Sequence, residues 1–246
     1  MSALSKNLKF VVTHFSKLGG ALRNGRAKPL VALLTAALLG APWLAAQAQS
    51  QAQAKALPSA ATHTILVVGD SLSAEYGLKR GTGWVPLLEK QLAADKKSAS
   101  VVNASISGDT TSGGRSRLPA LLARHTPGTV VIELGGNDAL RGLPLEMTAS
   151  NLTAMTQAAQ KSGAKVLLVG MQVPPNYGSA YSAGFSSLFA SVAKAEKAAL
   201  VPFFFKGIAD GDGASANFQA DRIHPNESSQ ARMLANVWPE LKKIIP

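Results

Sequence analysis

The stretch Ile65-Leu66-Val67-Val68-Gly69-Asp70-Ser71-Leu72-Ser73 decides the fold of this chain. Its first four residues form an apolar, β-branched run that a glycine closes, a pattern typical of a buried parallel strand. Ser71 follows at the carboxyl end of that strand, which is where the functional sites of open α/β sheets lie. A serine at this place is a candidate nucleophile, although serine and aspartate also favour helix caps and phosphate-binding turns.

The rest of the chain repeats the same alternation of a strand and a helix. Strands are expected at residues 65–68, 100–103, 129–134, 166–170 and 200–204. Helices are expected at residues 84–94, 116–124, 145–161, 182–199 and 226–244. Right-handed crossovers between such strands produce a parallel sheet with helices on both faces. We therefore expect an α/β fold, a flavodoxin-like three-layer α/β/α sandwich with about five parallel strands.

Three further segments carry residues that suit chemistry with Ser71. Residues 103–109 (Asn-Ala-Ser-Ile-Ser-Gly-Asp) and 135–138 (Gly-Gly-Asn-Asp) each follow an expected strand, so both belong to the same edge of the sheet. Residues 221–225 (Asp-Arg-Ile-His-Pro) lie near the C-terminus. Acyl transfer needs a nucleophile, a base, a group that orients the base, and hydrogen-bond donors for the oxyanion. Together the segments offer all of these parts.

His224 and Asp221 are the expected base and its orienting group. The proline after His224 keeps this histidine out of the helical region and suits the first turn of a helix, so we expect His224 on a loop. Asp221 can accept from one ring nitrogen and raise the basicity of the other. Taken alone, this segment also fits a capping aspartate beside a surface histidine. His63 and His125 are interpreted as structural.

The oxyanion donors are expected from the backbone N–H groups of Ser71 and Gly108 and from the carboxamide of Asn137. A glycine suits this task because no side chain obstructs the approach of a substrate to its backbone. Asp70 and Asp138 are assigned to capping, since a carboxylate aimed at an oxyanion would oppose its charge.

These blocks resemble the SGNH or GDSL hydrolase family, whose signature residues Ser, Gly, Asn and His match Ser71, Gly108, Asn137 and His224. Within that family the chain is similar to bacterial periplasmic acyl-CoA thioesterases that are also arylesterases and lysophospholipases. The similarity covers nearly all of residues 62–246 and is carried by the segments GDSLSAEYG, VVNASISGDTTSGG, RLPALL, ELGGNDALRG and PPNYG.

The resemblance implies the SGNH hydrolase fold and a secreted serine esterase or thioesterase that uses Ser71, His224 and Asp221 as a triad. It also implies acyl ester or thioester substrates: aryl esters, acyl-CoA and lysophospholipids. Two charged residues, Glu75 and Arg222, stand where small residues are more usual, and we expect them to bring charge to the rim of the site and affect substrate preference.

An apolar groove for the acyl chain is expected beside the catalytic residues. Its predicted lining lies in and next to the loops 141–144 and 174–181 and consists of Leu140, Leu143, Tyr177, Tyr181 and Phe185. A carbohydrate O-acetyl esterase is the alternative enzyme, and it would need little of this lining. The alternative from another class is a non-catalytic periplasmic binding domain on the same fold; the presence of every catalytic residue argues against it.

Several other classes of function are excluded by what the sequence lacks. There is no cysteine, no His-x-x-x-His and no carboxylate cluster at ligand spacing, so neither a metal nor a cofactor is expected. No P-loop follows the first strand, and no G-x-S-x-G elbow occurs. Basic residues are scattered and aromatic residues are few, which argues against nucleic-acid binding.

Residues 1–48 are expected to be a secretory signal peptide. They contain basic but no acidic residues, an apolar run at 29–44, and Ala-Gln-Ala at 46–48, which is an A-x-A cleavage pattern. The apolar run is shorter than the roughly 20 residues that span a bilayer, which favours cleavage over a retained anchor. Cleavage leaves a flexible lead-in at 49–61 and one hydrolase domain at 62–246. We expect a periplasmic or secreted monomer without stable membrane insertion.

Overall fold

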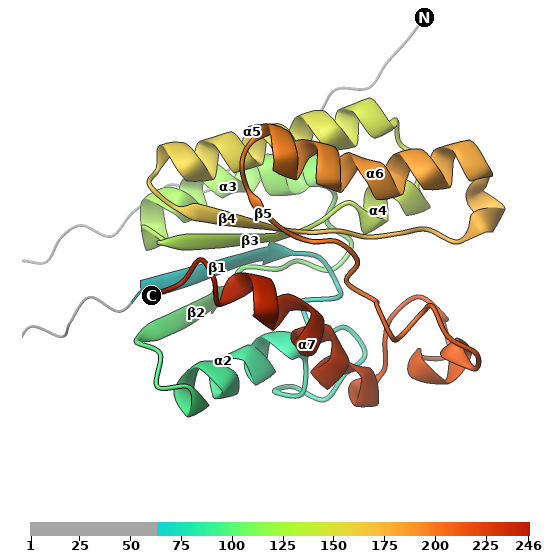
Figure 1. The fold of residues 1–246 in the computed structure, drawn as a ribbon, viewed down its shortest axis with the longest axis horizontal. Helices are drawn as coiled ribbons and strands as arrows, with labels where there is room; N and C mark the ends of the chain where they lie inside the picture. Colours follow the sequence, from blue (N-terminus) through green and yellow to red (C-terminus); the bar gives the residue numbers. More distant parts are fainter. Residues whose placement is uncertain (1–62) are drawn as a thin grey trace, which may run out of the picture. The chain divides into compact units, whose positions relative to one another are not determined.

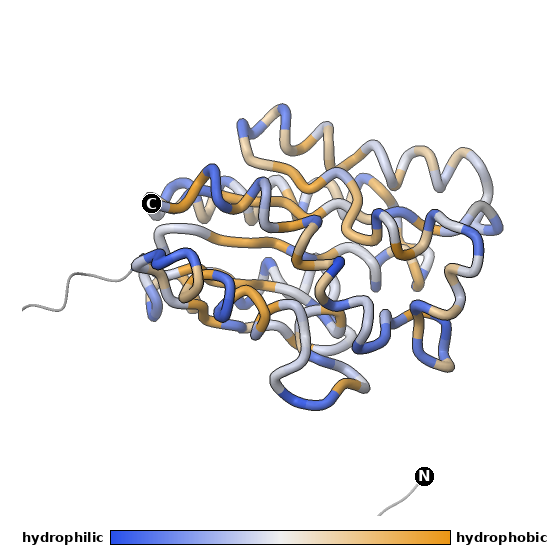
Figure 2. Tube along the Cα trace, turned by 60° about the horizontal axis from the view of Figure 1, so that its bottom comes forward, coloured by the Kyte–Doolittle hydropathy of each residue, from blue (hydrophilic) through white to orange (hydrophobic). Residues whose placement is uncertain are grey.

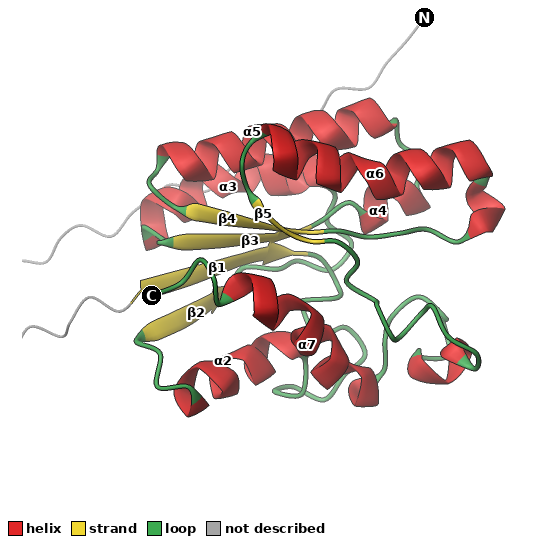
Figure 3. Cartoon of the chain, in the orientation of Figure 1, coloured by secondary structure: helices red, strands yellow, loops and turns green. Residues whose placement is uncertain are grey.

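A computed structural model of the chain describes residues 63–246. Five parallel strands form one sheet: β1 (His63–Gly69), β2 (Ala99–Asn103), β3 (Thr129–Glu133), β4 (Lys165–Val169) and β5 (Ala199–Val201). Helices α2 (Trp84–Ala94) and α7 (Gln230–Leu241) cover one face (Figure 1). The other face carries α3 (Thr111–His125), α5 (Leu145–Lys161) and α6 (Ser179–Ala195) (Figure 3). The predicted three-layer α/β/α sandwich is confirmed.

The strand order is β2-β1-β3-β4-β5, so the sheet changes its winding direction between β1 and β3. In open α/β sheets the crevice at such a switch point, outside the carboxyl ends of the strands, is where ligands bind. The register aligns Gly69 at the end of β1 with Glu133 at the end of β3. The loops that follow these two strands therefore start level with each other at one edge of the sheet.

The core is built on the central strands, which are buried on both faces. Ile65, Leu66, Val67 and Val68 of β1 have no exposed surface. Figure 2 shows the corresponding hydrophobic colouring along the strands in the centre of the molecule. Burial on both faces explains why the central strands β1, β3 and β4 contain continuous apolar runs and not alternating ones.

Several element boundaries differ from those predicted. Helix α3 begins at Thr111 and not at residue 116, because the Thr110 side chain caps it by accepting from the Gly113 N–H. The two glycines of its first turns hid this start, since glycine is a poor helix former. Strand β5 ends at Val201, before the predicted 204. Helix α7 begins at Gln230, after a 3₁₀ turn, η3 (Glu227–Ser229), and not at 226.

The remaining short elements are α4 (Gly136–Leu140), η1 (Pro175–Tyr177) and η2 (Ala214–Asn217). Helix α4 was not predicted; it forms from the Gly-Gly-Asn-Asp block that follows β3. Within residues 63–246, no helix combines the length and the apolar character that a membrane crossing requires. The predicted signal peptide (1–48) and lead-in (49–61) lie outside the described residues.

Candidate active site

Ser71 lies on a tight turn directly after β1. Two hydrogen bonds to Asp70 shape this turn. The side-chain Oδ1 accepts from the Leu72 N–H at 3.0 Å, and the backbone carbonyl accepts from the Ala74 N–H at 3.0 Å. Only glycine fits at position 69: a Cβ there would lie 2.8 Å from Glu133 Oε2. The turn leaves Ser71 half-buried at the switch-point edge.

His224 and Asp221 reach Ser71 from a loop closed by its own backbone. The Gln219 N–H donates to the His224 carbonyl at 2.8 Å. The His224 ring lies between its two expected partners, with Nε2 2.8 Å from the Ser71 Oγ and Nδ1 2.7 Å from the Asp221 Oδ2. The hydrogen-bond chain expected from the sequence is thus present, although Ser71 and His224 are 153 positions apart in the sequence.

The second oxygen of Asp221 is held by the backbone. Its Oδ1 accepts from the N–H groups of Ile223 at 2.9 Å and His224 at 3.0 Å. Partial burial acts to raise the pKa of Asp221, but these N–H groups and the His224 ring outweigh it and lower the pKa to about 2. The carboxylate is therefore charged at any pH at which the imidazole acts as a base.

Asn137 and Gly108 also lie at this edge. Asn137 is in the first turn of α4, where its Nδ2 donates to the Asp70 Oδ2 at 2.9 Å. A carboxamide carries two Nδ2 hydrogens, so one remains for a ligand. Gly108 has a φ of +78°, and a Cβ added there would meet only the Arg141 Nη2, at 3.9 Å. The backbone of Gly108 is thus open to a substrate.

Asp138 turns away from the other site residues, as the capping assignment requires. It is fully buried, and its Oδ2 accepts from the N–H of Thr111, the first residue of α3, at 2.9 Å. Its Oδ1 accepts from the hydroxyls of Thr111 and Thr148. The Asp138 carboxyl group therefore links α4 to the beginnings of α3 and α5.

The two charged residues that differ from the family pattern, Glu75 and Arg222, lie in different surroundings. Glu75 was expected at the rim, but its Oε1 accepts from the N–H groups of Gly81 and Gly83 at 2.8 Å each, so it holds the loop after the nucleophile together. Arg222 is exposed beside Asp221 and has a φ of +58°.

Tyr76 is a site residue that the sequence analysis missed. Its ring packs against the His224 imidazole with centroids 4.5 Å apart, although about half of the tyrosine (51%) is exposed. The Gln219 Nε2 donates to the Tyr76 carbonyl at 2.9 Å and joins the two loops. No local pattern signals this contact, because it depends on which loops the fold brings together.

The predicted lining of the acyl groove is only partly at the surface. Leu140 and Tyr177 are exposed, by 48% and 37%. Leu143 is half-buried, and its carbonyl accepts from the Tyr181 hydroxyl at 3.2 Å. The prediction for Phe185 is wrong: it is fully buried in the core beneath Tyr181, because it faces the sheet from α6.

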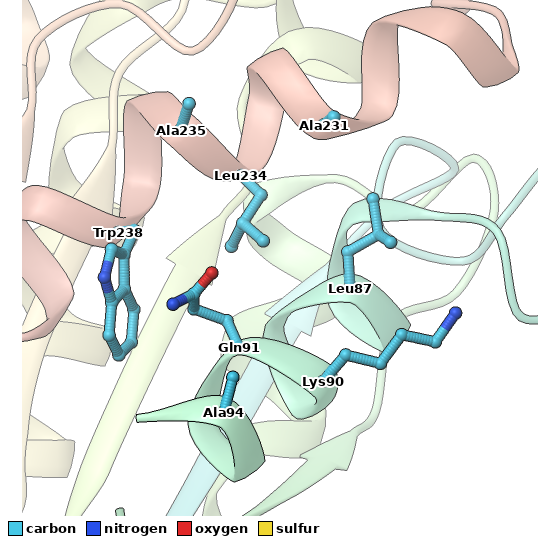
Figure 4. Close-up of a pocket in the computed structure, with 8 residues that line it drawn as sticks. All are labelled: Leu87, Lys90, Gln91, Ala94, Ala231, Leu234, Ala235 and Trp238. Atoms are coloured by element: carbon cyan, nitrogen blue, oxygen red, sulfur yellow. The ribbon is translucent and has the colours of Figure 1, made fainter. Parts of the chain in front are cut away.

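The clearest hollows of the described residues lie elsewhere. One is an apolar groove between α2 and α7 (Figure 4), and another lies beside β5 and α7. Neither is lined by Ser71, Asn137 or His224. Residues 63–246 contain no group of three or more His, Asp or Glu side chains placed to hold a metal ion.

Comparison with known proteins agrees with this geometry. Residues 67–232 match the GDSL-like Lipase/Acylhydrolase family. The chain belongs to this family. This chain is 54% identical to an esterase named TesA from Pseudomonas aeruginosa over 186 residues, which are 76% of this chain and 91% of the relative. A crystal structure of a protein named TesA, 54% identical in sequence, superposes with a TM-score of 0.71 and covers 74% of this chain and 100% of that one.

A second relative of this GDSL family member is the thioesterase 1/protease 1/lysophospholipase L1 of Escherichia coli. It is 41% identical over 172 residues, which are 70% of this chain and 80% of the relative. Family membership and relatives named as esterases and thioesterases make the chain a carboxylic ester hydrolase.

Proposed function

We propose that this hydrolase cleaves acyl esters and thioesters with Ser71 as nucleophile, His224 as general base and Asp221 as the group that orients the base. The observation that carries the proposal is the unbroken hydrogen-bond chain from the Ser71 hydroxyl through both His224 nitrogens to Asp221. Serine is a weak nucleophile until a neighbouring base takes its proton, and the Nε2 at 2.8 Å is placed to do so.

The reaction follows in two displacements. Ser71 Oγ attacks the carbonyl carbon while its proton passes to His224 Nε2, and the charge that develops on the carbonyl oxygen is stabilised by N–H donors. We assign these donors to the Ser71 and Gly108 backbones and to the second Nδ2 hydrogen of Asn137. The tetrahedral intermediate collapses and expels the alcohol or thiol, which takes the proton from Nε2. Water then attacks the acyl-serine by the same route and releases the carboxylic acid.

The proposed substrates carry an apolar acyl chain. The large exposed hydrophobic residues of the described chain include four that lie within five positions of a proposed catalytic or oxyanion residue: Tyr76, Ile106, Leu140 and Ile223. An apolar border on an ester-cleaving site favours fatty acyl groups over acetyl groups. The names of the relatives, esterase, arylesterase, thioesterase and lysophospholipase, support the proposed substrates: aryl esters, acyl-CoA and lysophospholipids.

The site is proposed to work outside the cytoplasm. The basic start, apolar run and A-x-A pattern of residues 1–48 support export to the periplasm or medium and removal of this segment. We propose that the mature protein is a monomer without stable membrane insertion.

The test is Ser71→Ala in the mature protein. We expect hydrolysis of p-nitrophenyl butyrate to fall by about 10⁴-fold or more and covalent labelling by a fluorophosphonate to disappear, because no other hydroxyl lies against His224 Nε2 in the described residues. His125→Ala is the matched control: His125 ends α3 at the opposite edge of the sheet, so both readouts should be unchanged. Labelling of the Ser71→Ala variant at the rate of the wild-type protein would refute the assignment.

A further inference from the structure

The Asp70 carboxyl group contacts both the nucleophile turn and an oxyanion donor. It is 2% exposed and directly precedes Ser71. Its Oδ1 accepts from the Leu72 N–H, which belongs to the turn, and its Oδ2 accepts from the Asn137 Nδ2 at the start of α4. The Asp70 carboxyl group thus accepts hydrogen bonds from two segments that follow different strands, the turn after β1 and helix α4 after β3.

We propose that Asp70 is a positioning residue that fixes the Asn137 carboxamide, so that one Nδ2 hydrogen is held by Asp70 and the other points to the oxyanion. This inference rests on the proposed hydrolase site. An asparagine side chain otherwise rotates freely about its terminal bond, and a donor that has to be oriented during the reaction stabilises the transition state less. The capping role expected for Asp70 is also present, but it accounts for only one of the two oxygens.

A second buried network holds Asp70 in place from behind. The Glu133 Oε2 lies 3.4 Å from the Asp70 N–H nitrogen and accepts from the Ser73 hydroxyl at 2.7 Å. The indole of Trp84 donates to the same hydroxyl at 3.1 Å. Glu133, Ser73 and Trp84 are each at most 1% exposed, so these contacts are shielded from water. The backbone of Asp70 therefore has little freedom to move relative to β3.

The charge state of the pair suits the proposed task. Burial raises the pKa of Glu133 well above its ordinary value, with the charge of Asp70 as the next cause. Burial also raises the pKa of Asp70 to about 6, against the opposing effects of Leu72, His224 and Asn137. Near neutral pH the proton of the pair thus resides on Glu133, and Asp70 is the carboxylate that Asn137 meets. A carboxylate accepts a hydrogen bond more strongly than a neutral carboxyl.

The other charged or titratable groups around Asp70 do not replace it as the partner of Asn137. Those that face it from the neighbouring elements are Glu133 at the end of β3, His224 with Asp221 on the loop before η3, and Asp109 with its ion-pair partner Arg117 at α3. Asp109 is occupied by the Arg117 guanidinium at 2.8 Å. Asp221 is occupied by His224 and two backbone N–H groups.

A double-mutant cycle tests whether Asp70 acts through Asn137. The mature wild-type protein, Asp70→Asn, Asn137→Ala and the double variant are compared on p-nitrophenyl butyrate. We expect Asn137→Ala to lower kcat by about 10²–10³-fold. Asp70→Asn should lower kcat by about 10-fold or more with KM changed less than about twofold, because the lost interaction matters in the transition state. In the Asn137→Ala background, Asp70→Asn should cost less than about threefold.

The cycle has clear contrary outcomes and a control. Wild-type activity in Asp70→Asn, or a double variant whose loss is the product of both single losses, would overturn the inference while leaving the proposed function intact. The proposed function is tested separately, by the activity and fluorophosphonate labelling of the Ser71→Ala variant. Asp95→Asn is the matched control, since Asp95 is an exposed residue at the end of α2 whose side chain accepts a hydrogen bond from Gln91.

A measurement on the wild-type protein covers the case in which Asp70→Asn does not fold. By NMR, one Asn137 carboxamide hydrogen should exchange with water at least about 10-fold more slowly than the carboxamide hydrogens of Asn176, an exposed residue of η1. Exchange of both Asn137 hydrogens at the rate of Asn176 would show that Asp70 does not hold the side chain.

Discussion

The protonation state of Glu133 is set by its buried surroundings. It ends the central strand β3 and is 1% exposed, a position where an unpaired charge would cost several kcal/mol. The raised pKa keeps the group neutral, and the Ser73 hydroxyl satisfies one oxygen. The close approach of this side chain to β1 is also the reason that position 69 is glycine.

At the residue scale, we expect Glu133→Gln to stabilise the protein at alkaline pH. The folded protein keeps a proton on Glu133 that the unfolded chain releases above its ordinary pKa of 4.5. Folded-state proton binding therefore exceeds that of the unfolded state, and stability falls as pH rises above that value. Glutamine is neutral in both states, so its Tm should exceed that of the wild-type protein at pH 8, with the difference shrinking toward pH 4.

The matched control is Glu89→Gln, at an exposed position of α2, which should leave the pH dependence of Tm unchanged. Parallel Tm curves for Glu133→Gln and the wild-type protein between pH 4 and 8 would mean that Glu133 is charged in the folded state.

At the scale of elements, the loops after the strands carry both the proposed chemistry and the exposed apolar residues. Ile106 lies two positions before Gly108, Leu140 is the last residue of α4, which carries Asn137 in its first turn, and Ile223 precedes His224. Two of these loops are also joined, because the Arg141 Nη2 donates to the Gly108 carbonyl at 2.9 Å. The strands thus position the proposed catalytic groups, and the loops that follow the strands border these groups with hydrophobic side chains.

We expect Leu140 to set part of the preference for acyl chain length. Each buried methylene contributes up to about 0.8 kcal/mol, or about fourfold, so kcat/KM on p-nitrophenyl esters should rise from acetate over the first few added carbons and then level off. Leu140→Ser should flatten this rise and leave acetate hydrolysis within about twofold. The exposed α3 residue Ala123, changed to Ser, should have no effect. Acetate as the best ester would favour the carbohydrate acetyl esterase instead.

At the scale of the whole molecule, charge is divided unevenly along the chain. The full sequence has a formal charge of +11, and the part after residue 48 has 19 basic and 14 acidic residues, a net charge of +5. The excess positive charge of the first 48 residues precedes their apolar run, as export signals require. The hydrolase domain itself is only mildly basic.

We expect export to remove this segment. When the full chain is expressed in a Gram-negative host, intact-mass spectrometry of the periplasmic fraction should give a protein that begins near Gln49. Ala48→Pro should reduce cleavage, because the A-x-A pattern ends at this residue; Ala56→Pro, beyond the predicted site, is the control. Recovery of an unprocessed chain in the membrane fraction would instead identify residues 29–44 as a retained anchor.

Much of the fold was determined by the sequence alone. A parallel strand buried on both faces has to be a continuous apolar run, so each strand could be placed to within a few residues. The position of Ser71 at the end of such a run, and of Asn137 after another, followed from the same rule. Helix starts were harder to predict where glycine obscured them, as at α3 and α4. At α3, the Thr110 cap and the Asp138 carboxyl group from elsewhere in the chain stabilise the first turn.

Only the tertiary structure decided which distant groups meet. Nothing local to Asp70 shows that its carboxyl group reaches Asn137, 67 positions away, or that Glu133 lies behind it; both contacts arise because β1 and β3 are neighbours in the sheet. Likewise the burial of Phe185 and the packing of Tyr76 on His224 depend on how whole elements are arranged. Sequence patterns encode burial and local turns, whereas contacts between distant residues are set by the packing of the elements that carry them.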